Sequence, residues 1–204
     1  MRKLTEADGA LVALSAAMGA RDDAKTAAAL RAAGAVAAAD AVEEVLIQSY
    51  LFLGYPASLN ALAAWRRISG HPAPATAAGD GPWDERGAAV CRTVYGGQYD
   101  RLRENIRALH PDMERWMVHE GYGKVLGRPG LPLATRELCI AALLAALDAP
   151  KQLYSHLRGA LNAGASEGEV EEALEAARRV SAPDVAHRAA EQWDTLRTRM
   201  AGES

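Results

Sequence analysis

The sequence has little of what marks several classes of protein. It contains two cysteines, Cys91 and Cys139, which lie far apart and form no C-x-x-C pair. Neither a disulfide framework nor a cysteine zinc site is therefore indicated. No apolar run has the length of a membrane span, and a net charge of −3 gives no basic surface for nucleic acid or an anionic membrane. We expect no nucleic-acid or membrane partner, and a cytoplasmic protein.

Aromatic residues are also scarce, at 5% of the chain, and no segment alternates apolar and polar residues as a strand would. Hydrophobic residues make up 50% and charged residues 24%, which is typical of a globular protein. Alanine dominates the apolar residues and favours closely packed helices, so we predict an all-α fold. The basic N-terminus and the apolar stretch Gly9–Ala20 resemble a signal peptide. Because Glu6 and Asp8 interrupt that order, we interpret the stretch as a helix of the mature fold.

The chain divides into two similar parts. Residues 70–82 are rich in glycine, proline and alanine without periodicity, which predicts a linker between a degenerate unit at residues 1–69 and a second unit at residues 83–204. A buried helix, a short helix, a glycine, a capped helix, a proline and a last helix follow one another in both units. This repeat predicts a pseudo-twofold arrangement. The matched positions are Gly34 and Gly164, Val42 and Val170, Pro56 and Pro183, Trp65 and Trp193, with Glu6 opposite Glu137 and Lys25 opposite His156.

Two adjacent helices in the second unit carry the strongest functional signal. Residues 136–147 are apolar almost all the way round, which predicts a buried helix with Glu137 in its first turn. Asp148 as N-cap and Pro150 then begin a helix whose apolar face includes His156. Two interpretations stay open for this carboxylate and imidazole. They are either structural groups in a core or a functional acid–base pair.

The segment EGYGKVLGRPGLPLATREL, followed by LLAAL, a histidine and ALNAGASEGEVEEAL, resembles the carboxymuconolactone decarboxylase family, whose wider all-α fold is called AhpD-like. The resemblance covers about residues 95–180, and the step of 19 residues from Glu137 to His156 matches the Glu–His spacing of the family. In the first unit, EVLIQSYLFLGYPASLNAL is similar to the ending of the family motif. The resemblance implies a homo-oligomer, with a trimer of fused pairs favoured.

The decarboxylase branch of the family implies a lyase that needs no cofactor or metal and acts on a small lactone or carboxylate. His156 would be the general acid/base, and Glu137 would orient its ring. Arg128 would either hold a substrate carboxylate or only brace the RPGL turn. Tyr122 and Trp116 would line the substrate pocket, although a core stripe explains them equally well.

Two other functions stay open. One is an AhpD-like alkylhydroperoxidase, a peroxiredoxin-type antioxidant enzyme, and the other is a non-catalytic oligomeric member of the family. AhpD-type peroxidases carry a C-x-x-C pair just before the histidine, and the matching positions here are Ala149 and Gln152. Cys139 falls within the buried helix, where a thiol is usually inert. The sequence therefore favours the decarboxylase over the peroxidase.

Overall fold

The computed structural model describes residues 2–77 and 81–203, and every element within them is helical. No strand occurs in this part of the chain, which confirms the predicted all-α fold. None of these helices has the length and apolar character that a membrane crossing requires. The predicted linker lies between two helices, and its residues 78–80 lie outside the described residues.

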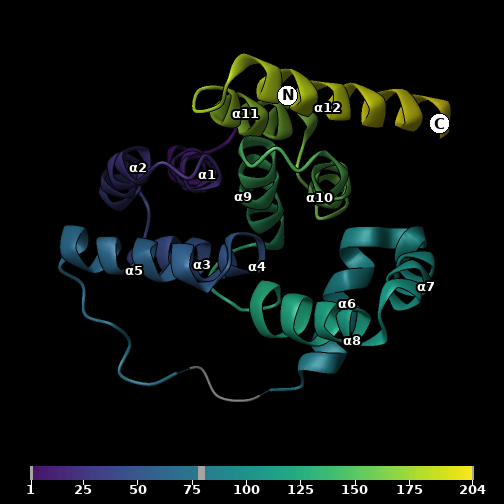
Figure 1. Ribbon diagram of the computed structural model, residues 1–204, viewed down its shortest axis with the longest axis horizontal. Coiled ribbons are helices and arrows are strands. Elements are labelled where there is room, and N and C mark those ends of the chain that lie inside the picture. Colours follow the sequence, from purple (N-terminus) through teal and green to yellow (C-terminus); the bar gives the residue numbers. More distant parts are fainter. Residues whose placement is uncertain (1, 78–80, 204) are drawn as a thin grey trace.

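Figure 1 shows the order of the helices and their arrangement around a central helix, α9. The first unit contains α1 (Glu6–Gly19), α2 (Asp23–Val36), α3 (Ala39–Gln48), α4 (Tyr50–Leu53) and α5 (Tyr55–Ser69). The second contains α6 (Trp83–Tyr95), a 3-10 turn η1 (Gly96–Gln98), α7 (Tyr99–Leu109), α8 (Pro111–Trp116), a π-helical segment η2 (Met117–Leu126), α9 (Leu133–Ala146), α10 (Pro150–Asn162), α11 (Glu167–Arg178) and α12 (Pro183–Glu203).

Helix α9 is buried along nearly its whole length, as its all-round apolar sequence predicts. It packs against α1, α10 and α11. Thr135 Oγ1 donates to Asp8 Oδ1 at 3.2 Å, and a Cβ added at Gly19 would lie 2.3 Å from Leu143 O. Helices α1 and α9 therefore run parallel with their backbones almost in contact. One continuous core joins residues 1–69 to the second unit.

Glycines also allow α6 to pack closely against η2. A Cβ at Gly87 would lie 2.0 Å from Val118 O, and a Cβ at Gly123 would lie 2.0 Å from Trp83 O. The sequence predicts that the helix opened by Pro111 ends at residues 121–123. The structure instead continues it as π-helical turns to Leu126. Gly123 serves close packing rather than termination, because Trp83 of α6 occupies the space that a side chain would need.

The sequence predicts that Gly34 ends the second helix and that Asp148 is the N-cap of the helix opened by Pro150, and both predictions are wrong. Gly34 does not end the second helix but lies inside α2, where a Cβ would lie 2.9 Å from the Trp65 ring. The residue is glycine because the indole packs on it. Asp148 is not an N-cap, since Ala149 occupies that position and Asp148 has a left-handed φ of 60°. The Asp148 carboxylate instead binds Arg188, with Nη2–Oδ2 at 2.7 Å.

The same kind of tryptophan contact and the same kind of turn occur once in each unit. Trp65 Nε1 donates to Glu43 at 3.4 Å, and Trp193 Nε1 donates to Glu171 at 3.5 Å. The turns that follow α1 and α9 each contain a left-handed residue, Arg21 and Asp148 respectively. These features are consistent with the proposed repeat.

An alignment of the two units on these turns gives a residue pairing that differs from the one predicted from the sequence. Asp148 lies 127 residues after Arg21, so an alignment on these two turns places Ala10 and Ala29 opposite Glu137 and His156. This pairing differs by four residues from the predicted counterparts Glu6 and Lys25, because small insertions and deletions obscure the register in an alanine-rich sequence. Under this pairing, the first unit carries neither group of the pair.

Candidate active site

Helices α9 and α10 bring Glu137 and His156 together. Glu137 Oε2 lies 2.7 Å from His156 Nδ1, and the two residues are 0% and 7% exposed. Gly159, one turn after His156, leaves room for this contact, since a Cβ there would lie 2.8 Å from Glu137 Oε2. A carboxylate can only accept a hydrogen bond, so Nδ1 donates to Glu137, and in the neutral imidazole Nε2 then presents a lone pair. The sequence places these two groups on neighbouring core helices, and the structure brings them into direct contact.

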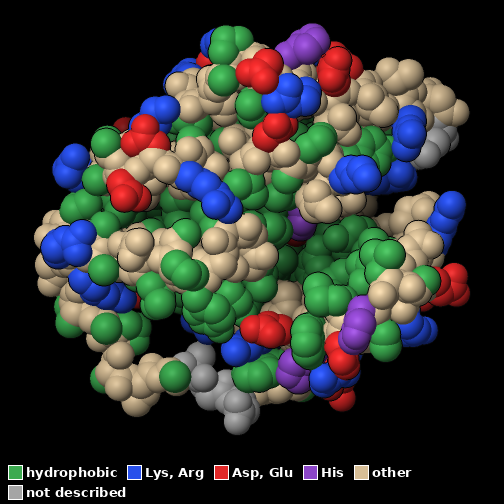
Figure 2. All heavy atoms as spheres, in the orientation of Figure 1, with side chains coloured by type: hydrophobic (Ala, Val, Ile, Leu, Met, Phe, Trp, Pro, Cys, Tyr) green, Lys and Arg blue, Asp and Glu red, His purple; other side chains and the backbone are tan. Residues whose placement is uncertain are grey.

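His156 lines a cavity of about 430 Å³, a size suited to a small molecule. The cavity is lined mostly by aromatic and aliphatic side chains, and Phe52 packs edge-on to the imidazole with ring centres 5.5 Å apart. Figure 2 shows hydrophobic side chains gathered around a hollow on this face of the molecule. Within the described chain, Nε2 makes no hydrogen bond. The cavity wall is formed by Tyr50, Leu51, Phe52, Tyr55, Tyr95, Met113, Trp116, Met117, Glu120, Gly121, Tyr122, Leu126 and His156.

Two tyrosines form a hydrogen-bonded pair in the cavity wall. Tyr122 OH donates to Tyr95 OH at 2.8 Å, and the rings meet edge to face with centres 5.8 Å apart. Burial raises the pKa of Tyr122 well above the ordinary phenol value and also raises the pKa of Tyr95. Both phenols are therefore neutral at physiological pH. The Tyr95 hydroxyl accepts from Tyr122 and keeps its own hydrogen for a ligand.

A second tyrosine contact involves a carboxylate of the cavity wall. Tyr50 OH donates to Glu120 Oε1 at 2.7 Å, and burial together with this bond raises the pKa of Tyr50. The Tyr50 ring stacks on Tyr55, with centres 4.9 Å apart. Residues of α4 and α5 thus cover one side of the cavity, while η2 and α10 supply Glu120 and His156.

Arg128 does not lie in this cavity. Its guanidinium binds Glu44, with Nε–Oε1 at 3.0 Å and Nη2–Oε1 at 2.9 Å. The same carboxylate binds Arg136, which is 0% exposed, at 2.7 Å. Arg136 also donates to the carbonyl oxygens of Arg128 and Leu131. Arg128 and Arg136 therefore hold the RPGL turn onto α3, which corresponds to the structural alternative for Arg128.

The other two predicted wall residues do line the cavity. Tyr122 is 4% exposed and Trp116 is 48% exposed, so the first lies deep and the second lies at the rim. Sequence reasoning missed Tyr95, Tyr50 and Glu120. Tyr50 lies in the segment of the first unit that resembles the family motif, so the sequence could have indicated it as a site residue. Tyr95 precedes two glycines in a charged region and carried no signal of its own.

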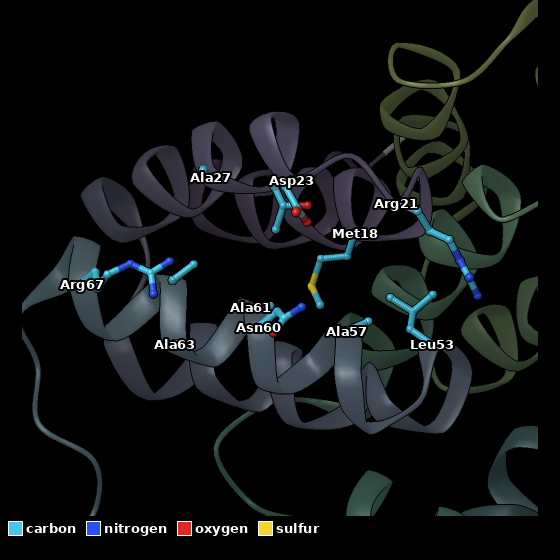
Figure 3. Close-up of a pocket in the computed structure, with 12 residues that line it drawn as sticks. Met18, Arg21, Asp23, Ala27, Leu53, Ala57, Asn60, Ala61, Ala63 and Arg67 are labelled. Carbon is cyan, nitrogen blue, oxygen red and sulfur yellow. The ribbon is translucent and has the colours of Figure 1, made fainter.

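A larger cavity of about 500 Å³ lies between α1, α2 and α5. Figure 3 shows Arg21 and Arg67 at its two ends, with Met18 and Asn60 between the helices. Its lining contains no histidine, cysteine or glutamate. The Glu137–His156 cavity is the better candidate active site because it combines an imidazole, a buried carboxylate and neutral phenol donors.

The cysteines lie in the core. Cys91 and Cys139 are fully buried and unpaired, and burial raises the pKa of each thiol to about 12. At neutral pH neither forms an appreciable amount of the reactive thiolate. Across residues 2–77 and 81–203, no group of three or more His, Cys, Asp or Glu side chains could hold a metal ion.

Comparisons with known proteins identify the family of this chain. Residues 111–194, which include Glu137 and His156, match the model of the carboxymuconolactone decarboxylase family. The chain is 33% identical over 91 residues to 4-carboxymuconolactone decarboxylase of Acinetobacter baylyi, covering 44% of this chain and 68% of that protein. It is 30% identical over 146 residues to Peroxisomal protein 2 of Schizosaccharomyces pombe, covering 69% of this chain and 68% of that protein. The all-helical fold, the motif and these matches together show that the chain belongs to the carboxymuconolactone decarboxylase family.

Proposed function

We propose that this protein is a cofactor-free enzyme that transfers a proton on a small unsaturated lactone or related carbonyl compound, a lyase where the substrate loses CO₂ and an isomerase where it does not, with His156 as the general acid/base. The observation that carries the proposal is the contact of 2.7 Å between His156 Nδ1 and Glu137 Oε2 at the wall of an apolar cavity. Glu137 holds the ring in one orientation and leaves Nε2 to exchange a proton with the substrate.

The chemistry of the family passes through an enolate. When CO₂ leaves a lactone, or when a proton leaves the carbon next to its carbonyl, the released electron pair moves onto the carbonyl oxygen. That oxygen then needs a hydrogen-bond donor, and the carbon needs a proton. Tyr95 OH supplies the donor, and it is polarised by the bond from Tyr122. His156 supplies or removes the proton at Nε2.

A simple assay tests the proton-transfer step. The neutral lactone α-angelica lactone becomes its conjugated isomer when a proton is removed beside the carbonyl and returned at the far end of the enolate. Ultraviolet absorbance follows the conjugated product. We expect the protein to accelerate this isomerisation, and a rate equal to that in buffer, together with no turnover of 4-carboxymuconolactone, would contradict the proposed function.

Replacing Tyr95 by phenylalanine should lower the rate of lactone isomerisation about 10²-fold, because the enolate oxygen loses its hydrogen-bond donor. Tyr122→Phe should have a smaller effect, since Tyr95 keeps its own hydrogen. The measurement is kcat and KM for α-angelica lactone. Tyr154→Phe is the matched control, because Tyr154 OH accepts from Arg199 outside this cavity. Equal rates for Tyr95→Phe and the control would remove Tyr95 from the mechanism.

The alternative function is a dithiol peroxidase, and we expect its activity to be negligible. Ala149 and Gln152 stand where the family's redox thiols belong, and the two cysteines lie buried with a raised pKa. The measurement is peroxide consumption with a dithiol reductant by the native protein, Cys91→Ser and Cys139→Ser. Robust turnover that disappears in either variant would make a single cysteine the nucleophile and restore the peroxidase function.

A further inference from the structure

The cavity that holds His156 has a carboxylate in its wall and no permanent cation. Apart from His156 and Glu120, its lining within the described chain consists of aromatic and aliphatic side chains and a glycine. Glu120 accepts a hydrogen bond from Tyr50 OH at 2.7 Å, and no described Lys or Arg forms an ion pair with it. Glu120 therefore places a negative charge beside the space that a substrate occupies.

Nearby cations line neighbouring cavities rather than this one. Arg128 lines a neighbouring cavity, beyond Tyr50 and Tyr55, and is bound to Glu44. Lys124 lines the same neighbouring cavity and lies 5.5 Å from the centre of the Trp83 ring. On the other side, a separate cavity that shares Tyr95 is lined by Arg101, Arg158 and Arg199, and Arg199 donates to Tyr154 OH at 3.2 Å. A carboxylate on a ligand in the His156 cavity would therefore find no guanidinium or ammonium partner in the cavity wall.

We infer that the His156 cavity selects uncharged lactones or related carbonyl compounds and disfavours substrates that carry a carboxylate. An anionic ligand would lose its hydration in an aromatic cavity without gaining an ion pair, and Glu120 would repel it. A neutral ligand avoids both costs and gains apolar contacts with the tyrosines and Trp116. The inference rests on the proposed function, because it assigns the substrate class of that same site.

This substrate class also limits the reaction. A neutral lactone has no carboxylate to lose, so no CO₂ is released. His156 Nε2 takes a proton from the carbon next to the carbonyl, and the C–H electron pair moves onto the carbonyl oxygen. The imidazolium then returns the proton to the conjugated carbon, which regenerates the carbonyl and moves the double bond. Every atom and electron is accounted for within the substrate and His156.

A matched pair of ligands tests the inference by calorimetric titration. Coumarin is an uncharged lactone, and coumarin-3-carboxylate is the same ring system with one negative charge. We expect the native protein to bind coumarin at least about tenfold more tightly than its carboxylate. Glu120→Gln should reduce this ratio to within about threefold by removing the repulsion. Asp112→Asn, which removes an exposed carboxylate of α8 outside the cavity, should leave the ratio unchanged.

Three results would overturn the inference: no binding of coumarin by the native protein, equal or tighter binding of the carboxylate, or the same ratio in Glu120→Gln as in the native protein. The test requires no turnover, so it is independent of the catalytic role of His156. If His156→Gln kept full activity, the proposed function would fail while the binding ratio could still hold. If the native protein preferred the carboxylate while His156→Gln was inactive, only the substrate class would be wrong.

Discussion

Replacing His156 by glutamine should lower the rate of lactone isomerisation at least about 10²-fold. Glutamine has a polar end that can still donate to Glu137, so the contact in the core can be kept. Its amide cannot accept and return a proton as Nε2 of imidazole does. The measurement is the initial rate with α-angelica lactone, together with a thermal melt that reports whether the variant folds.

A second histidine provides the control for that experiment. His119 Nδ1 lies 2.7 Å from Asp84 Oδ1, so it also pairs with a carboxylate, but this pair is exposed. His119 does not line the His156 cavity. His119→Gln should therefore keep the native rate. A folded His156→Gln variant that handles a cognate substrate normally would disprove the catalytic role, whereas an unfolded variant would favour a structural role in the core.

Replacing Glu44 by glutamine should lower the free energy of unfolding by about 3–5 kcal/mol. Glu44 is 7% exposed, and its carboxylate binds Arg136, a guanidinium that is 0% exposed. Without the carboxylate charge, Arg136 keeps neutral partners such as Gln48 and the Leu131 carbonyl oxygen, but its own charge stays buried and unpaired. Urea denaturation followed by circular dichroism measures the change.

An exposed ion pair provides the comparison for Glu44. Glu175 binds Arg178 on the surface of α11, with side-chain exposures of 37% and 65%. Water already screens this pair, so Glu175→Gln should change the free energy of unfolding by less than about 1 kcal/mol. Equal losses in the two variants would mean that burial does not determine the contribution of Glu44, and that its role in bracing the RPGL turn is small.

The parts of the fold and site that could be predicted depend on local pattern. The all-round apolar run of α9 indicates a buried helix, and the apolar face of α10 carries His156 toward it. Because both helices pack in one core and follow each other in the chain, periodicity predicts that Glu137 and His156 lie on neighbouring buried helices. The resemblance to the family then pairs these two residues, because the step of 19 residues between them matches the family's Glu–His spacing.

The remainder of the site depends on contacts between distant residues. The sequence was equally consistent with Arg128 binding a substrate carboxylate and with Arg128 bracing the turn. Its partner Glu44 lies 84 residues away in the chain, so no local pattern indicates the contact. Tyr95 meets Tyr122 only because Gly87 and Gly123 let α6 and η2 approach closely. Asp148 is of a residue type that is preferred at N-caps, but it adopts a left-handed φ. Residue preference alone does not predict that backbone conformation.

The cavity takes its walls and its imidazole from distant parts of one chain. Tyr50, Phe52 and Tyr55 come from the first unit, whereas His156 and Glu120 come from the second. In an assembly of identical single-unit subunits, one repeat sequence has to encode both the wall and the acid–base pair. Here a change at Tyr50 or Tyr55 alters one wall without replacing a member of the acid–base pair, whereas Phe52 packs on the His156 ring. Substrate preference and proton transfer can therefore diverge separately during evolution, and directed evolution can begin with this wall.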